Sequence, residues 1–68
     1  MLTVYLEVLE WDIEDGVVVD SRPSQDWIGT KVHNTDIKTG QYLIITPPNG
    51  QPAQVLYPVK KVEEKASV

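Results

Sequence analysis

Four glycines divide this sequence into segments of nearly equal length. Gly16, Gly29, Gly40 and Gly50 are 13, 11 and 10 residues apart, and each lies among residues that are common in turns. The segments between them are rich in β-branched and aromatic residues, which favour strands. This spacing leaves room for strands of about five or six residues. The pattern predicts an all-β fold, either a small five-stranded antiparallel barrel or a strongly twisted meander.

The first eight residues show the alternation of a strand that buries one face. Apolar side chains occupy every second position from Leu2 to Val8, which is the period of a β-strand. From Leu9 onwards they fall on the opposite parity, so we expect one strand from Leu2 towards Trp11, with a bulge or sharp bend near Val8 and Leu9. The apolar residues of segment 2–13 also fit helical spacing, and a partly helical segment is the alternative. The β-branched and aromatic residues favour the strand, and no N-cap residue precedes Leu2.

Four further strands are expected, after which the chain ends in a charged tail. Their approximate ranges are 17–22, 30–34, 41–46 and 53–59. Pro47-Pro48-Asn49-Gly50 fits a type I turn. Pro58 indicates that the last strand lies at a sheet edge, because proline lacks the N–H that a central strand needs. We therefore expect a single β domain over residues 1–62, in the size class of SH3-like and OB-like barrels, and a flexible, frayed tail over residues 63–68.

The chain has few ways to stabilise so small a domain. Its 68 residues make one domain, and a chain of this length buries only about 60% of the surface that its unfolded state exposes. It contains no cysteine and a single histidine, so disulfides and the usual zinc frameworks are excluded. A second chain that completes the core is one way to reach adequate stability. Self-association is therefore a hypothesis that follows from size alone.

Charge is distributed unevenly along the chain. The net charge is −4; residues 1–36 carry eight acidic side chains against two basic ones, and residues 37–68 carry four basic ones against two acidic ones. Affinity for nucleic acid depends on Lys and Arg that displace counterions from phosphates, so direct binding to DNA or RNA is disfavoured. No apolar run is long enough to cross a bilayer, and the N-terminus lacks the basic and apolar regions of a signal peptide. We expect a soluble, cytoplasmic protein that does not bind membranes.

No group of residues typical of an active site occurs in the sequence. His33, the only histidine, is expected on a solvent-facing strand surface, without a nucleophile or an orienting carboxylate beside it. The carboxylates of segment 10–15 could bind a hard cation, but a calcium loop starting at Asp12 would place Gly16 fifth instead of sixth and Pro23 twelfth. Glycine-rich phosphate loops that lead into helices are not present either. We expect neither catalysis nor a cofactor, a metal ion or a small-molecule substrate.

Every aromatic residue of this chain carries a polar group, because it has two Trp, three Tyr and no Phe. Such side chains suit half-buried positions and are enriched in contact surfaces. Trp11 falls on a predicted strand, where core packing is the simpler interpretation. Trp27 lies in a loop over residues 22–29, and two interpretations stay open: it closes one end of the barrel, or it contacts a partner. The candidate binding residues are Trp27, Asp26, Arg22 and Trp11.

Together these features predict a non-catalytic protein-interaction module. It would act through an acidic face and the loop over residues 22–29, on another protein whose basic surface the acidic charges attract. In its strongest form this would be mimicry of nucleic acid in a basic groove, although ordinary solubility explains the acidic residues equally well. The alternative is a self-associating structural protein, a homodimer or small ring formed through an edge strand or the Trp and Tyr surface, without a separate ligand site.

Overall fold

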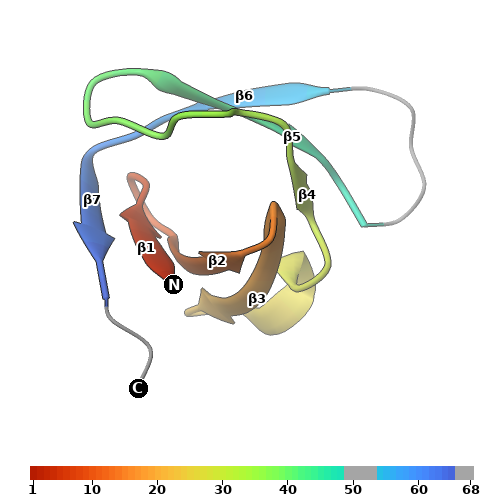
Figure 1. Cartoon of the computed structure of the whole chain (residues 1–68). Helices are drawn as coiled ribbons and strands as arrows, with labels where there is room; N and C mark the ends of the chain where they lie inside the picture. The colour runs from red at the N-terminus through yellow and green to blue at the C-terminus, as the bar shows by residue number, and fades with distance from the viewer. Residues whose placement is uncertain (49–53, 66–68) are drawn as a thin grey trace.

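The computed structural model of the protein shows one antiparallel sheet that curls on itself into a barrel-like shape (Figure 1). It describes residues 1–48 and 54–65, and within these ranges the sheet has seven strands in the order β6-β5-β4-β3-β2-β1-β7. The elements are β1 (Leu2–Tyr5), β2 (Glu10–Glu14), β3 (Val17–Arg22), the 3-10 helix η1 (Gln25–Trp27), β4 (Lys31–Val32), β5 (Tyr42–Thr46), β6 (Val55–Pro58) and β7 (Lys61–Glu64). The predicted small antiparallel all-β fold is confirmed, with seven strands in place of five.

The long first strand expected from the sequence is in fact two strands joined by a tight turn. The Leu6 N–H donates to the Leu9 carbonyl at 2.7 Å, and Glu7 and Val8 form the exposed tip between them. The chain therefore reverses where a bulge or bend was expected, and segment 2–13 contains no helix. This reversal explains the change of parity at Leu9, because the apolar side chains of β1 and β2 face the same core from two antiparallel strands.

A bulge in β3 decides which of its side chains face outwards. The register of β2 against β3 shifts between Asp12 and Ile13, and Val19 is left without a partner residue. Strict alternation along β3 would turn Asp20 towards the core. The extra residue places both Asp20 and Arg22 on the outer face instead, which is a known effect of bulges on side-chain direction.

The hairpin between β2 and β3 shows why residue 16 is glycine. Asp15 and Gly16 form its two-residue loop with φ angles of 52° and 72°, and positive φ at both positions is the geometry of a type I′ turn. A Cβ on Gly16 would also lie 3.3 Å from the carbonyl oxygen of Val32. The Val32 N–H donates to the Gly16 carbonyl at 2.8 Å, which fixes this close approach. The turn expected at Gly16 is confirmed.

Gly16→Ala should destabilise the domain by about 1–2 kcal/mol, because an L-residue is strained at positive φ and its Cβ meets Val32. Gly40→Ala is the matched control. Gly40 has a φ of 87°, but no described atom lies within 4 Å of an added Cβ, so only the backbone strain is expected there. Urea unfolding of both variants measures the difference. Equal losses of unfolding free energy in the two variants would show that the close contact with Val32 adds nothing to the backbone strain.

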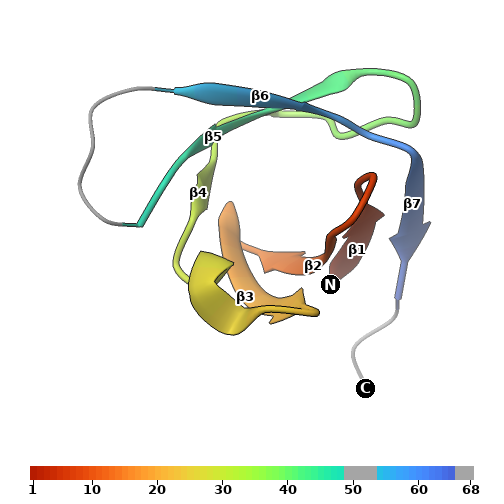
Figure 2. The ribbon, with the colours of Figure 1, turned by 180° about the vertical axis from the view of Figure 1, so that it is seen from behind.

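Val59 and Lys60 carry the chain from one edge of the sheet to the other. The Val59 N–H donates to the Gln41 carbonyl at 2.8 Å, which extends the β5–β6 pairing, and the Lys60 N–H donates to the Tyr5 carbonyl at 2.8 Å, beside the β1–β7 pairing. Two consecutive residues thus bond to strands far apart in the sheet order. The Val59 side chain is only 3% exposed and belongs to the core. Seen from the front and from behind, this corner joins β6 to β7 and closes the curl of the sheet (Figures 1 and 2).

Some boundaries expected from the sequence differ from those of the structure. Glu63 and Glu64, placed in the tail over residues 63–68, belong to β7 and pair with β1. Residues 66–68 of that tail lie outside the described residues. So do Asn49 and Gly50 of the expected type I turn and the expected strand start at residue 53.

The core fills the space between the walls of the curled sheet. Its buried apolar side chains are Val4, Leu6, Trp11, Ile13, Val18, Val32, Leu43, Ile45 and Val59. Trp11 is the largest side chain with no exposed surface. Since so short a chain buries little apolar surface in total, this one indole is a large share of what stabilises the fold.

Candidate functional site

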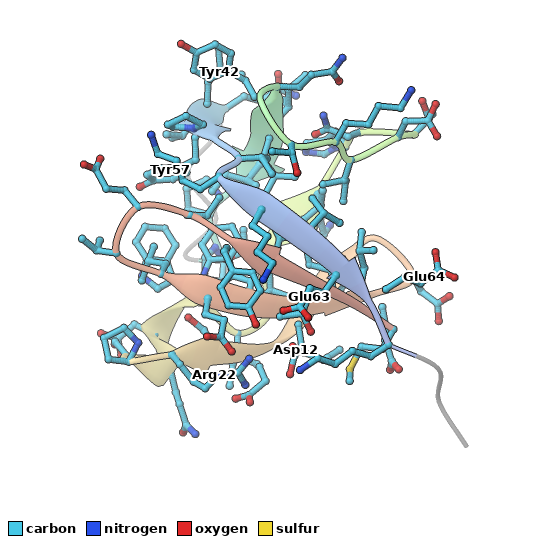
Figure 3. The ribbon with its side chains drawn as sticks, turned by 90° about the vertical axis from the view of Figure 1, so that its left-hand side faces the viewer. Asp12, Arg22, Tyr42, Tyr57, Glu63 and Glu64 are labelled. Atoms are coloured by element: carbon cyan, nitrogen blue, oxygen red, sulfur yellow. The ribbon has the colours of Figure 1, made fainter. Side chains whose placement is uncertain are left out.

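The outer surface of β7, β1, β2 and β3 is polar and is called the acidic face below. Side chains of these strands alternate, so those that point away from the core meet solvent. The charged ones are Glu10, Asp12, Asp20, Arg22, Lys61 and Glu63. Figure 3 shows Asp12, Arg22 and Glu63 on this side of the barrel. Four carboxylates therefore share a surface with Arg22 and Lys61, and Lys65, directly after β7, lies close enough to act on Asp12 and Glu63.

Arg22 is the centre of the acidic face. Its Nε and Nη2 atoms donate to Glu10 Oε2 at 3.0 and 2.6 Å, and Nη1 and Nη2 each donate to an oxygen of Asp12 at 3.2 Å. Nη1 also donates to Asp20 Oδ2. A guanidinium presents its donors in one plane, which suits such forked contacts. One cation thus holds three carboxylates from two strands, and the group keeps an excess of negative charge.

Asp12 has a second donor besides Arg22. Thr3 Oγ1, from β1, donates to Asp12 Oδ1 at 2.7 Å. The hydrogen bonds from Arg22 hold the pKa of Asp12 below its usual range, and the bond from Thr3 adds to this, against the opposing effect of burial. The hydrogen bonds to Asp12 and Glu10 in turn raise the pKa of Arg22. Both groups are therefore ionised throughout the neutral pH range.

Tyr5, on β1, contacts side chains of β7 within the acidic face. Interaction of its hydroxyl with the neighbouring Glu63 carboxylate raises the pKa of Tyr5 to about 12 and lowers the pKa of Glu63. Lys61 Nζ lies 5.5 Å from the centroid of the Tyr5 ring, within the range of a cation–π contact. The same Nζ lies 3.8 Å from Glu63 Oε1. These contacts order the β7 side of the acidic face.

Glu63→Gln should lower the pKa of Tyr5 from about 12 towards the ordinary value of about 10, because the carboxylate that favours the protonated phenol is lost. A pKa raised on folding adds stability that is fully present below pH ~10 and is lost as the pH rises through the folded value. Ultraviolet titration of tyrosinate measures the pKa, and Glu64→Gln, on the same strand, is the control. An unchanged last titration step in Glu63→Gln would contradict the assignment.

A surface pocket of about 310 Å³ lies at one end of the acidic face, at the turn between β1 and β2. It is lined by Tyr5, Leu6, Glu7, Val8, Leu9, Glu10, Arg22 and Pro23. Val8 is 76% exposed, which is an unusual position for a valine side chain. The pocket combines apolar side chains with the carboxylates of Glu7 and Glu10. A lysine side chain needs both, since its aliphatic stem prefers apolar contact and its end is charged.

Trp27 packs on the core instead of standing free in its loop. Its ring centroid lies 5.6 Å from that of Trp11 and 5.9 Å from that of Tyr57, and the centroids of Trp11 and Tyr57 are 6.0 Å apart. Rings at these separations touch one another, so the three form a filled cluster without space for a ligand between them. Trp27 is half-buried, and its packing favours the interpretation in which it closes the barrel. Trp11, fully buried, offers no surface to a partner.

Two other residues singled out from the sequence are exposed. Asp26 lies on η1, and its backbone N–H donates to the Ser24 N-cap at 3.3 Å. Its carboxylate makes no ion pair with the part of the chain that the structure describes. His33 follows β4, where its Nε2 lies 2.6 Å from Thr46 Oγ1. The structure therefore brings only Arg22, among the four candidate binding residues, to the centre of the acidic face.

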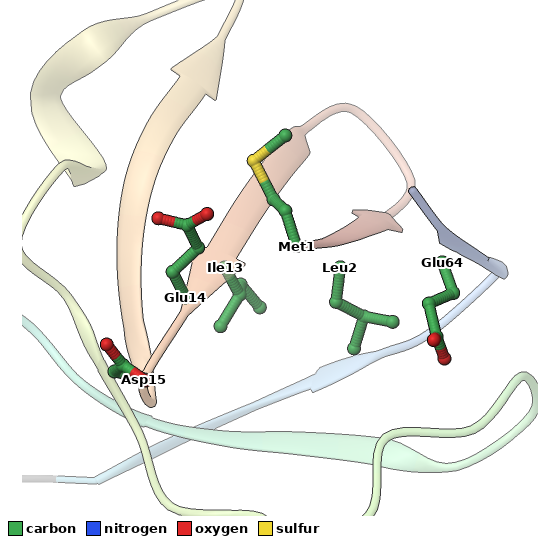
Figure 4. A pocket seen from close by; sticks show the side chains of 6 residues that line it. All are labelled: Met1, Leu2, Ile13, Glu14, Asp15 and Glu64. Atoms are coloured by element: carbon green, nitrogen blue, oxygen red, sulfur yellow. The ribbon is translucent and has the colours of Figure 1, made fainter. Parts of the chain in front are cut away.

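A second hollow, of about 470 Å³, lies at the N-terminus of β1 (Figure 4). Its lining residues are Met1, Leu2, Ile13, Glu14, Asp15 and Glu64. Glu14 and Asp15 are thus here, whereas the other two carboxylates of segment 10–15 are bound to Arg22 on the acidic face. In residues 1–48 and 54–65 no group of three His, Asp or Glu side chains is arranged to hold a metal ion.

Arg22 was predicted from the sequence as a binding residue, but the carboxylates that it binds were not. A signal for Glu10 and Asp12 was present, because residues two apart in a strand lie on the same face. The same rule places Asp20 beside Arg22, but only the bulge at Val19 makes the face that they share the outer one. The acidic face expected from the charge distribution could be located only once the strands were paired.

The acidic face offers ordered carboxylates, a central guanidinium and an adjoining pocket, a combination suited to binding a cationic group. The helical part of the described chain is one short 3-10 helix, and no helix there has the length and apolarity needed to cross a membrane. No protein-family model, curated protein or solved structure matches this chain.

Proposed function

We propose that the protein is a non-catalytic binding module that takes a basic segment of another protein on its acidic face. The observation that carries the proposal is the convergence of Glu10, Asp12 and Asp20 on Arg22. These carboxylates are ordered before any partner arrives, so little side-chain freedom is lost on binding. The three carboxylates carry more charge than the single guanidinium between them, so cationic groups of a partner would neutralise the excess.

The pocket at the turn between β1 and β2 supports this choice of partner. It continues the acidic face at Glu10 and Arg22 and adds an apolar wall that includes Val8 and Leu9. An anionic surface alone attracts any cation, whereas an anionic surface beside an apolar pocket distinguishes long basic side chains from small ions. A segment that carries lysine beside an aliphatic residue therefore fits best.

The loop over residues 22–29 borders the same surface. It begins at Arg22, and Pro23 lines the pocket. Further along, Asp26 and Ile28 are exposed and extend the surface with one more carboxylate and one apolar side chain. Trp27 anchors the loop to the barrel through its contacts with the core.

Neutralising the acidic face should weaken binding of a basic peptide. The probe is a short synthetic peptide of lysine and valine, and a peptide with glutamate in place of lysine is the ligand control. Glu10→Gln combined with Asp20→Asn removes two charges at Arg22, and we expect Kd to rise about fivefold, since two exposed charges contribute about 1 kcal/mol together.

The matched control variant is Glu14→Gln with Asp15→Asn. It removes the same charge at the other hollow, and asparagine tolerates the positive φ of residue 15. We expect its Kd to stay near that of the unmodified protein, and binding to weaken with added salt. Equal weakening in both variants would show that only net charge matters, and the proposal would fail.

A further inference from the structure

The outer surface of β5 and β6 exposes large apolar side chains. In the register of these strands Tyr42 lies opposite Pro58, and Ile44 lies opposite Leu56. All four belong to one face, because positions two apart in a strand point the same way. Tyr42 is 60% and Leu56 57% exposed. With Lys31 and Thr46, which lie opposite each other on β4 and β5, these side chains form what is called the hairpin face below.

Lysines border the hairpin face at both ends. Lys31 lies at the Thr46 end. At the Tyr42 end, the turn over residues 38–41 bonds to Val59 through the Gly40 N–H, which places Lys38 and Lys60 near this corner. Asp36 is the acidic residue of the same connection. An apolar surface with a surplus of cations at its margin is thus present on a protein of net charge −4.

Backbone pairing at the β6 edge is a poor route to association. The Val59 N–H points to β5, so by alternation the N–H groups of Leu56 and residue 58 would point to the free edge. Residue 58 is proline and has no N–H, which leaves a short edge with few donors. At this end of the sheet, side chains of the hairpin face, not the β6 edge, are therefore the available contact.

We propose that the acidic face of one copy of this chain binds the hairpin face of a second copy. This inference rests on the proposed function, since it names the basic and apolar partner as the chain itself. The two faces are complementary in charge and lie on opposite sides of the molecule, with Tyr42 far from Arg22 and Asp12 (Figure 3). Contact between two different faces is heterologous, so copies add head to tail in an open row or a ring.

The size of the hairpin face sets the expected strength. Interfaces at the low end of the stable range bury about 600 Å² on each partner, which is roughly an eighth of the 4495 Å² surface of this chain. The hairpin face, with six side chains on three short strands, is small by this measure. Association should therefore be weak, dependent on concentration and weakened by salt, because charged margins contribute to it.

A complementation experiment in the analytical ultracentrifuge tests the proposal. The acidic-face variant is Glu10→Gln with Asp20→Asn, and the hairpin-face variant is Tyr42→Thr with Leu56→Thr, all at half-buried or exposed positions. At low salt the average mass of the unmodified protein should rise over a tenfold increase in concentration. Each variant alone should associate more weakly than the unmodified protein, the acidic-face variant about fivefold so. An equimolar mixture should form a dimer and nothing larger. The intact acidic face of the hairpin-face variant binds the intact hairpin face of the acidic-face variant, and the two substituted faces that remain bind a further copy poorly.

Three results would overturn the inference: a monomeric unmodified protein at all concentrations, an acidic-face variant that associates as strongly as the unmodified protein, or a mixture that forms no dimer. The lysine–valine peptide separates this inference from the function proposed above. If the unmodified protein binds the peptide but stays monomeric, the hairpin face is not the partner and the binding module stands. If neither peptide nor second copy binds, both proposals fail. Thermal melts of each variant verify that it is folded.

Discussion

Replacing Trp11 by alanine should remove a large part of the free energy of unfolding of the protein. Trp11 has no exposed surface and contacts both Trp27 and Tyr57. Removing a buried tryptophan costs about 3–5 kcal/mol, because transfer free energy is lost and a cavity remains. A domain of 68 residues has a total stability of only about 3–10 kcal/mol. Circular dichroism with urea titration measures the loss, and a cooperative transition within about 1 kcal/mol of the unmodified protein would contradict this account of the core.

Trp11→Phe keeps the prediction testable if the alanine variant does not fold. The Trp11 Nε1 atom is buried and has no hydrogen-bond partner among the described residues. An unmade hydrogen bond of this kind costs about 1–3 kcal/mol, and phenylalanine removes the donor. We therefore expect Trp11→Phe to fold, with a loss well below that of Trp11→Ala. A loss as large as that of alanine would show that the shape of the indole matters more than its unpaired N–H.

Trp27→Ala should lower the free energy of unfolding by about 2 kcal/mol. Trp27 is half-buried, so roughly half the cost of a fully buried tryptophan is expected. Its ring centroid lies 5.6 Å from that of Trp11 and 5.9 Å from that of Tyr57, and the loss of these aromatic contacts is included in that cost. Tyr42→Ala, at a 60% exposed site, is the control and should change stability by about 0.5 kcal/mol or less in dilute protein.

Peptide binding by Trp27→Ala separates its two interpretations. If Trp27 closes the barrel, the variant is less stable, but at a temperature where it is folded its affinity for the lysine–valine peptide is unchanged. If Trp27 contacts the partner, the affinity falls while the melt moves little. A double-mutant cycle with Tyr57→Ala measures the ring contact directly, and a coupling energy near zero would contradict the packed cluster.

Local sequence patterns were sufficient for the fold class. The alternation in segment 2–5 and the Asp15-Gly16 turn depend on neighbouring residues alone, since strand period and positive φ are properties of the local backbone. The turn at Glu7 and Val8 escaped detection for the same reason. It has none of the residues that usually mark turns, so only the pairing of β1 with β2 reveals it. The split of the first strand and the additional strand β7 together account for seven strands in place of five, and the fold class was right.

Only part of the acidic face could be predicted from the sequence. Its charge followed from composition, and the spacing of Glu10 and Asp12 places both on one side of a strand. Asp20 and Arg22 lie on that same side only because of the bulge at Val19, which depends on how β3 fits against β2. Arg22 was chosen from its place near Trp27, yet its partners are these three carboxylates.

Strand alternation, turn glycines and composition are local properties of the chain, and they were enough to predict an all-β protein with an uneven charge. Three features became visible only in the folded chain: β6 and β7 lie at opposite ends of the sheet order, Trp27 packs on Trp11, and the acidic and apolar faces lie on opposite sides. Register and closure depend on how the whole sheet buries its apolar side chains at once. No short segment carries that information, since each strand has more than one way to pair.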